Sequence, residues 1–235
     1  MKNDKLAIFP RIDYSYWFQK NNWEKRSSIQ TMLSNLKNKN LIDEDITIAN
    51  IKYRIQIEVE QYLITASENA LLNAFINIQV WGGSSARIHT PKIIQNFLVH
   101  KKKYRNAVDL ILKNEISHAF KYLNNEGKIE GLGVSFIPKH ICYWSGKGIR
   151  IEGAPILDNV ISKILYNKPV NNIDYDTFII EMNVFSKSIN MKPAEVEIAL
   201  FSFAQNYWET NKTRTNKFRK VIEDNKDELV AISLI

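Results

Sequence analysis

The sequence is poor in the residues that cross-link a chain or interrupt its helices. Its single cysteine, Cys142, excludes an internal disulfide and leaves no ligands for an all-cysteine zinc or iron–sulfur site. Eight glycines and six prolines in 235 residues favour long helices over a many-turned β-sandwich. No apolar run approaches the roughly 20 residues that cross a bilayer, and residues 1–18 lack the apolar segment of a signal peptide. We therefore expect a soluble, cytoplasmic protein with no membrane partner.

The chain carries more positive than negative charge. Its 32 Lys and Arg residues exceed the 25 Asp and Glu residues, which gives a net charge of +7 and a pI near 9.3. A basic domain often binds a polyanion, most commonly nucleic acid, although a lysine-rich proteome gives the same balance. The four histidines show no spacing typical of zinc ligands, so we expect neither a metal nor a cofactor.

The spacing of apolar residues predicts helices along most of the chain. The expected helices are 15–39, 68–80, a segment that Pro91 opens and that breaks near 100–103, 107–123 and 193–208. The segment 51–60 alternates with a period of two, which fits a strand, but Ile51, Ile55 and Val59 also have helical spacing. We prefer a helix because no partner strand occurs nearby. The prediction is an all-α fold.

The most informative stretch is a glycine hairpin between two expected helices. Gly131 and Gly133 bracket one apolar residue, so the backbone there can adopt positive φ values. Ser135 is expected to cap the next helix, and Pro138 is tolerated only within the first turn of that helix. The free N–H groups of the hairpin and the positive end of the helix predict a site for a nucleic-acid phosphate.

The helix after the hairpin carries a candidate nucleophile. Its apolar residues Ile137, Ile141 and Trp144 should face the core, whereas Lys139 and Tyr143 should point elsewhere. The positive end of a helix and partial burial both lower the pKa of a lysine, and an unprotonated amine could attack a sugar C1′ and expel a base. The alternative is an ordinary exposed lysine on an amphipathic helix.

Two more residues near this helix need an interpretation. Asp158 immediately precedes a helical pattern, so its carboxylate lies at a helix N-terminus and could stabilise positive charge on an opened sugar. An ordinary N-cap is the alternative, and the two roles are compatible. His140 follows the lysine, but a single histidine beside a core face is more often structural than a catalytic base.

These features together resemble the helix-hairpin-helix DNA glycosylase superfamily, and most closely its 8-oxoguanine DNA glycosylase branch. In that family the lysine forms a Schiff base and the aspartate assists, which implies these roles for Lys139 and Asp158, nineteen residues apart. The loop 82–88 is similar to the family's minor-groove loop, so Arg87 is implied to contact the base left unpaired, with Ser84 as a further DNA contact. The resemblance covers roughly residues 70–165.

The resemblance implies a two-lobed helix-hairpin-helix DNA glycosylase fold. A helical-barrel lobe would span 58–148, and a second lobe would combine 1–57 with 149–235. The implied hairpin contacts to DNA come from Gly131, Gly133 and Ser135.

The implied activity is that of a DNA glycosylase/AP lyase that excises an oxidised or otherwise modified base through a lysine Schiff base. Its partner would be double-stranded DNA with a modified base flipped from the stack, and we expect a monomer. One alternative is a non-catalytic DNA-binding module with the same hairpin; the chain also resembles small glycosylase-fold proteins of bacterial anti-phage gene clusters. Another alternative keeps the chemistry but acts on an RNA base or a nucleoside. The sequence leaves the recognised base open.

Overall fold

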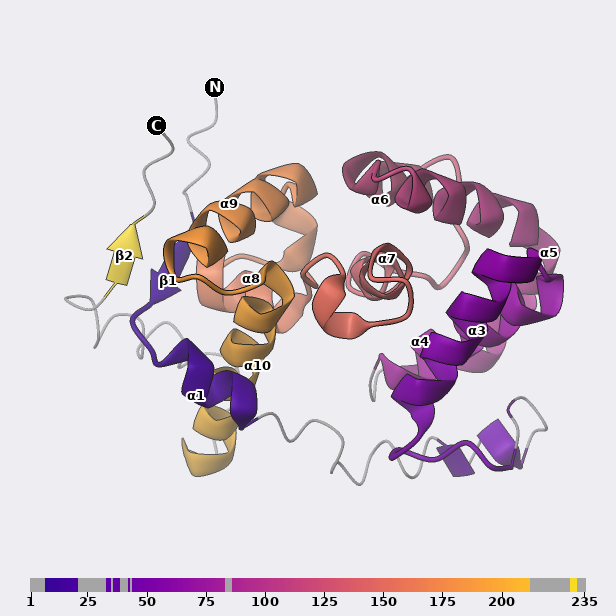
Figure 1. The fold of residues 1–235 in the computed structure, drawn as a ribbon, viewed down its shortest axis with the longest axis horizontal. Coiled ribbons are helices and arrows are strands. Elements are labelled where there is room, and N and C mark those ends of the chain that lie inside the picture. The colour runs from indigo at the N-terminus through magenta and orange to yellow at the C-terminus, as the bar shows by residue number, and fades with distance from the viewer. Residues whose placement is uncertain are drawn as a thin grey trace. The chain divides into compact units, whose positions relative to one another are not determined.

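The computed structural model describes residues 7–20, 33–34, 36–38, 42, 44–82, 86–211 and 229–231, with the backbone alone for 86–91, 207–211 and 229–231. The chain divides into two compact units, Met1–Asn22 with Pro155–Ile235 and Trp23–Ala154. Apart from one pair of short strands, the regular structure of the described residues is helical, so the predicted all-α fold is confirmed (Figure 1). No helix in these ranges is long and apolar enough to cross a membrane. The lobe limits 58–148 and 1–57 with 149–235 stay predictions.

The unit Trp23–Ala154 is built around one buried helix, α7. Its described elements are α3 (Ile51–Thr65), α4 (Glu68–Trp81), α5 (Ala86–Leu112), α6 (Ile116–Asn124), α7 (Ile137–Ser145) and the 3-10 helix η2 (Arg150–Glu152). Helix α7 contacts α3, α4, α5, α6 and η2. Ile137, Ile141 and Trp144 face the core as predicted. Tyr143 is buried as well, so the prediction that it points away from the core is wrong, because neighbours contact α7 from several directions.

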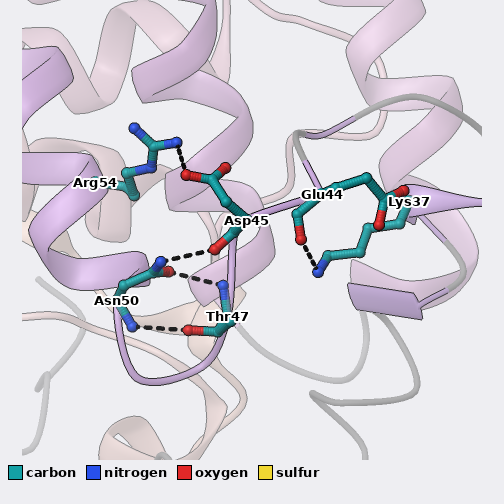
Figure 2. Close-up of polar contacts among 6 residues, drawn as sticks. All are labelled: Lys37, Glu44, Asp45, Thr47, Asn50 and Arg54. Carbon is teal, nitrogen blue, oxygen red and sulfur yellow. Dashed lines mark hydrogen bonds and ion pairs between the residues drawn. The ribbon is translucent and has the colours of Figure 1, made fainter.

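The residues before α3 form a hydrogen-bonded turn that leads into the helix. The Thr47 N–H donates to Asn50 Oδ1 (2.7 Å) and the Asn50 N–H donates to Thr47 Oγ1 (3.2 Å), and Asn50 is the N-cap residue of α3 (Figure 2). Asn50 also donates to the carbonyl of Asp45, whose carboxylate pairs with Arg54 on α3. Ile51, Ile55 and Val59, which have i, i+4 spacing, are buried in α3. The helix prediction for this segment is therefore confirmed.

Helices α5 and α6 differ in part from the prediction. The expected break near 100–103 is confirmed by a kink at His100 (φ −114°, ψ 22°), but α5 begins at Ala86 and not at Pro91. The expected continuous helix 107–123 is wrong, because Asn114 adopts a left-handed conformation (φ 63°) that ends α5. The N–H groups of Asn114 and Glu115 donate back to α5 carbonyls, which is a Schellman ending.

The other unit combines the two ends of the chain. Its described elements are β1 (Ile8–Pro10), α1 (Tyr14–Gln19), α8 (Asn159–Tyr166), η3 (Val170–Asn172), α9 (Tyr175–Ser188), α10 (Pro193–Asn211) and β2 (Leu229–Ala231). Strands β1 and β2 pair antiparallel, and α10 packs against α1, α8 and α9. Helix α10 confirms the predicted helix 193–208. Helix α1 covers only the start of the predicted helix 15–39, of which 21–32 lies outside the described residues.

A buried carboxylate connects three elements of this unit. Glu181 on α9 is fully buried and accepts the Ala7 N–H (3.0 Å) on one oxygen and the hydroxyl of Tyr166 on the other. Tyr166 is the last residue of α8, and Ala7 directly precedes β1. The ring of Phe9 on β1 stacks on Phe185 of α9 at 4.0 Å between centroids. Glu181 therefore holds both β1 and α8 against α9.

Candidate functional site

Lys139 is a buried lysine near the start of the central helix α7. Its side chain is only 9% exposed, and Nζ donates a hydrogen bond of 2.5 Å to the carbonyl oxygen of Gly82. Nζ also lies 4.3 Å from the centroid of the Phe136 ring, which is a cation–π distance. The amine is therefore held at a defined place by two groups that come from different parts of the chain.

Gly82 lies at the C-terminal end of α4, where the helix carbonyls carry partial negative charge. Its carbonyl therefore stabilises the ammonium form of Lys139, whereas the positive end of α7 acts in the opposite sense. A Cβ at Gly82 would lie 2.7 Å from Cε1 of Phe136 and 3.2 Å from Cδ of Lys139. Because residue 82 has no side chain, Phe136 and Lys139 can both pack against the C-terminal end of α4.

The glycine hairpin forms a tight turn, and its two glycines differ. The Leu132 N–H donates to the Ile129 carbonyl (3.0 Å), and Gly131 has φ +90° at the third position of this turn, as in a type II turn. A Cβ at Gly131 would lie 2.6 Å from Cγ1 of Ile93 on α5. The prediction of positive φ is confirmed for Gly131 and wrong for Gly133, where a Cβ would meet no atom within 4 Å.

The predicted cap by Ser135 is wrong. The N-cap of α7 is Phe136, and no side chain accepts a hydrogen bond there. The Gly133 carbonyl instead accepts the N–H groups of Phe136 (2.8 Å) and Ile137 (3.1 Å), so a turn brings the chain into the helix one residue later than expected. Pro138 lies in the first turn of α7 as predicted.

Three backbone donors of the hairpin have no acceptor within the part of the chain that the structure describes. They are the N–H groups of Gly133, Val134 and Ser135. Successive unpaired N–H groups beside a helix start favour an anion. DNA contacts by Gly131, Gly133 and Ser135 stay predictions.

The predicted minor-groove loop is shorter than expected. Because α5 begins at Ala86, Arg87 belongs to the first turn of a helix and not to a loop. Ser84 and the side chain of Arg87 lie outside the described residues. Gly82, the first residue of the predicted loop, contacts Lys139 through its carbonyl oxygen.

Asp158 is the N-cap of α8, as one of its two predicted roles requires. Its Oδ1 accepts the N–H groups of Val160 (2.8 Å) and Ile161 (3.0 Å). Asp158 and Lys139 belong to different units, and the assisting role of Asp158 stays a prediction.

His140 belongs to a buried network and not to the reacting groups. Tyr104 OH accepts the Trp144 Nε1–H (2.7 Å) and lies 2.6 Å from His140 Nδ1, while His140 Nε2 lies 2.9 Å from Nε2 of Gln79. Burial, and then the charge of Lys139, lower the pKa of His140 to about 3. The neutral imidazole of His140 therefore connects α7 to α4 through Gln79 and to α5 through Tyr104.

The sequence did not indicate two residues of this site, Gly82 as the acceptor and Phe136 as the ring beside Lys139. The one available signal was the pair Gly82-Gly83 directly after an apolar helical pattern, which marks a helix end whose carbonyls need a partner.

Comparison with known families assigns the chain to a class. The sequence matches the family described as "Putative 8-oxoguanine DNA glycosylase OGG-like protein" over residues 13–201, and the chain belongs to this family. The predicted resemblance is thereby confirmed. No curated protein sequence and no solved structure matches the chain. Family membership supports a DNA glycosylase function and a DNA substrate at the level of the family.

Proposed function

We propose that the protein is a bifunctional DNA glycosylase/AP lyase that excises an oxidised or otherwise modified base from double-stranded DNA. The observation that carries this proposal is the buried amine of Lys139, which follows a glycine hairpin and is held against the end of α4. Membership of the OGG-like family supports the same chemistry. Lys139 is the nucleophile of the proposed reaction.

The first half of the proposed reaction releases the base. Lys139 leaves the Gly82 carbonyl, loses a proton, and attacks C1′ of the flipped nucleotide through its nitrogen lone pair. The bond between C1′ and the base breaks, and the base leaves with the bonding electrons and gains a proton. The attached nitrogen loses a proton, and its lone pair then forms a C1′=N iminium as the C1′–O4′ bond breaks and O4′ is protonated.

The second half cleaves the strand and restores the enzyme. Loss of a C2′ proton expels the 3′ phosphate by β-elimination, and water then hydrolyses the iminium and frees Lys139. Asp158 would stabilise the positive charge of the opened sugar through its carboxylate. The hairpin donors of Gly131, Gly133 and Ser135, together with Arg87 and Ser84, would hold the DNA.

Borohydride trapping tests this proposal, because hydride adds to the iminium carbon and makes the protein–DNA link permanent. Duplexes that carry an abasic site or one of a panel of modified bases are incubated with the wild type, Lys139→Gln, and the control Lys113→Gln, whose side chain is exposed in the turn after α5. The wild type and the control should form an adduct, and Lys139→Gln should form none. Salt-dependent DNA binding without any adduct would instead favour the non-catalytic module.

A further inference from the structure

A second cation lies at the same end of α4 as Lys139. Arg150, the first residue of η2, places its guanidinium carbon 5.2 Å from the ring centroid of Trp81. Trp81 is the last residue of α4 and directly precedes Gly82, which holds the Lys139 amine. Two cations from different elements therefore contact adjacent residues, both within the unit Trp23–Ala154.

Cys142 fixes Arg150 to the helix that carries Lys139. Arg150 Nη1 donates to Cys142 Sγ (3.5 Å), and the Cys142 thiol donates to the Arg150 carbonyl (3.4 Å). Gly153, which follows η2, permits this approach, since a Cβ there would lie 1.9 Å from the Cys142 carbonyl oxygen. Residues 139 and 142 are three apart on α7 and so share one face. The guanidinium therefore has a fixed place relative to the Lys139 amine.

Trp81 presents a buried donor at this place. Its side chain is 7% exposed, and within the described residues its indole Nε1–H has no acceptor. The Tyr143 ring lies nearly perpendicular to the indole, at 5.0 Å between ring centroids, so Trp81 has aromatic as well as cationic neighbours. A buried donor without a partner is unfavourable, and an acceptor from a bound ligand would satisfy it.

We propose that Trp81 and Arg150 form a binding site for a phosphodiester oxygen of the DNA strand on which Lys139 acts; this rests on the proposed function. An indole N–H and a guanidinium can only donate, so the group that complements both is an acceptor. The cation–π contact places the planar guanidinium fork over the indole, and this fork fits phosphate oxygens. A phosphate bound there fixes the register of the strand, and Arg150 is thus a positioning residue for the attack by Lys139.

Equilibrium binding across a range of salt concentrations tests the phosphate contact. The probe is a duplex with a tetrahydrofuran abasic-site analogue, which lacks the C1′ hydroxyl and cannot form a Schiff base. Arg150→Gln should weaken binding about tenfold or more and reduce the slope of log K against log salt by about 0.9, the value for one phosphate contact. Arg150→Lys should keep the slope but bind more weakly, because it keeps the charge and loses the planar fork of donors. Trp81→Phe should weaken binding without changing the slope.

Methylphosphonates identify the phosphate. Each phosphate that flanks the abasic analogue is replaced in turn by the neutral methylphosphonate. The wild type and Lys113→Gln should lose affinity at one or two positions at which Arg150→Gln is insensitive. A wild-type salt slope and a wild-type methylphosphonate profile in Arg150→Gln would overturn the site. If Arg150→Gln does not fold, a wild-type affinity and profile in both Arg150→Lys and Trp81→Phe would overturn it.

The two proposals fail separately. Absence of a borohydride adduct with the wild-type protein rejects the lyase function. An adduct that forms normally, together with an Arg150→Gln variant that binds as the wild type does, rejects only the phosphate site.

Discussion

The neutral imidazole of His140 makes a quantitative prediction about stability and pH. Burial lowers its pKa from 6.5 to about 3. In the unfolded chain the imidazole binds a proton below pH 6.5, whereas in the folded protein it does so only below about 3. The unfolded state therefore holds more protons between these values, and stability falls as the pH falls through this window.

The size of the effect follows from the two pKa values. At pH 4.5 the unfolded imidazole is almost fully protonated and the folded one almost fully neutral. With about 1.4 kcal/mol for each pKa unit, the contribution of His140 at pH 4.5 is a loss of about 3 kcal/mol relative to pH 7. This is a large part of the total stability of a typical domain.

Urea unfolding followed by circular dichroism between pH 7 and pH 4.5 measures this loss. His140→Gln removes the titrating group. Between pH 7 and pH 4.5 its free energy of unfolding should therefore fall by about 3 kcal/mol less than that of the wild type, whatever its stability at pH 7. His118→Gln controls for the removal of a histidine as such, because the His118 side chain is exposed and lies outside the buried network of His140. A His140→Gln variant with the pH dependence of the wild type would refute the reasoning. An imidazole proton NMR signal of His140 that titrates near pH 6.5 would refute it as well.

Three further predictions concern the residues around Lys139 and Asp158. Gly131→Ala should lower the free energy of unfolding by about 2 kcal/mol, because Gly131 has a positive φ and a Cβ there would meet Ile93. Gly133→Ala should lower it by less than about 0.5 kcal/mol, because a Cβ there would meet no atom within 4 Å. Thermal melts compare the two variants, and equal losses of stability would contradict the prediction. Gly82→Ala should displace Phe136 and slow borohydride trapping at least tenfold in a folded protein; trapping at the wild-type rate would show that this contact does not position the amine. Asp158→Ala should lower the free energy of unfolding by about 1 kcal/mol, whereas Asp158→Asn should leave it almost unchanged, since asparagine also caps helices. Both variants should slow borohydride trapping, because both remove the carboxylate charge. Trapping at the wild-type rate by Asp158→Asn would show that Asp158 acts only as a helix cap.

Local patterns predicted most of the helices. The 51–60 segment is a helix because its i, i+4 residues are buried, and the hydrogen bonds between Thr47 and Asn50 order the turn directly before it. The glycine hairpin, the first-turn position of Pro138 and the cap at Asp158 also follow from residue types that favour particular backbone conformations. These features depend on neighbours within a few positions of the chain.

Contacts between distant segments could not be predicted. Lys139 and Gly82 are 57 positions apart, and no periodicity indicates that the end of α4 meets the start of α7. The burial of Tyr143 depends on how many helices surround α7, which a pattern along α7 alone does not contain. The error at Ser135 has the same origin, since the turn that the Gly133 carbonyl closes shifts the helix start by one residue.

Peptide mapping of the borohydride-trapped adduct tests the central claim most directly. After digestion of the DNA and of the protein with trypsin, the sugar remnant is located by mass spectrometry. A modified Lys139 blocks cleavage after residue 139, so the account predicts a peptide of residues 129–147 that carries the reduced sugar on the side-chain nitrogen of Lys139. A remnant on another lysine or on the N-terminal amine, with residues 129–139 recovered unmodified, would contradict it.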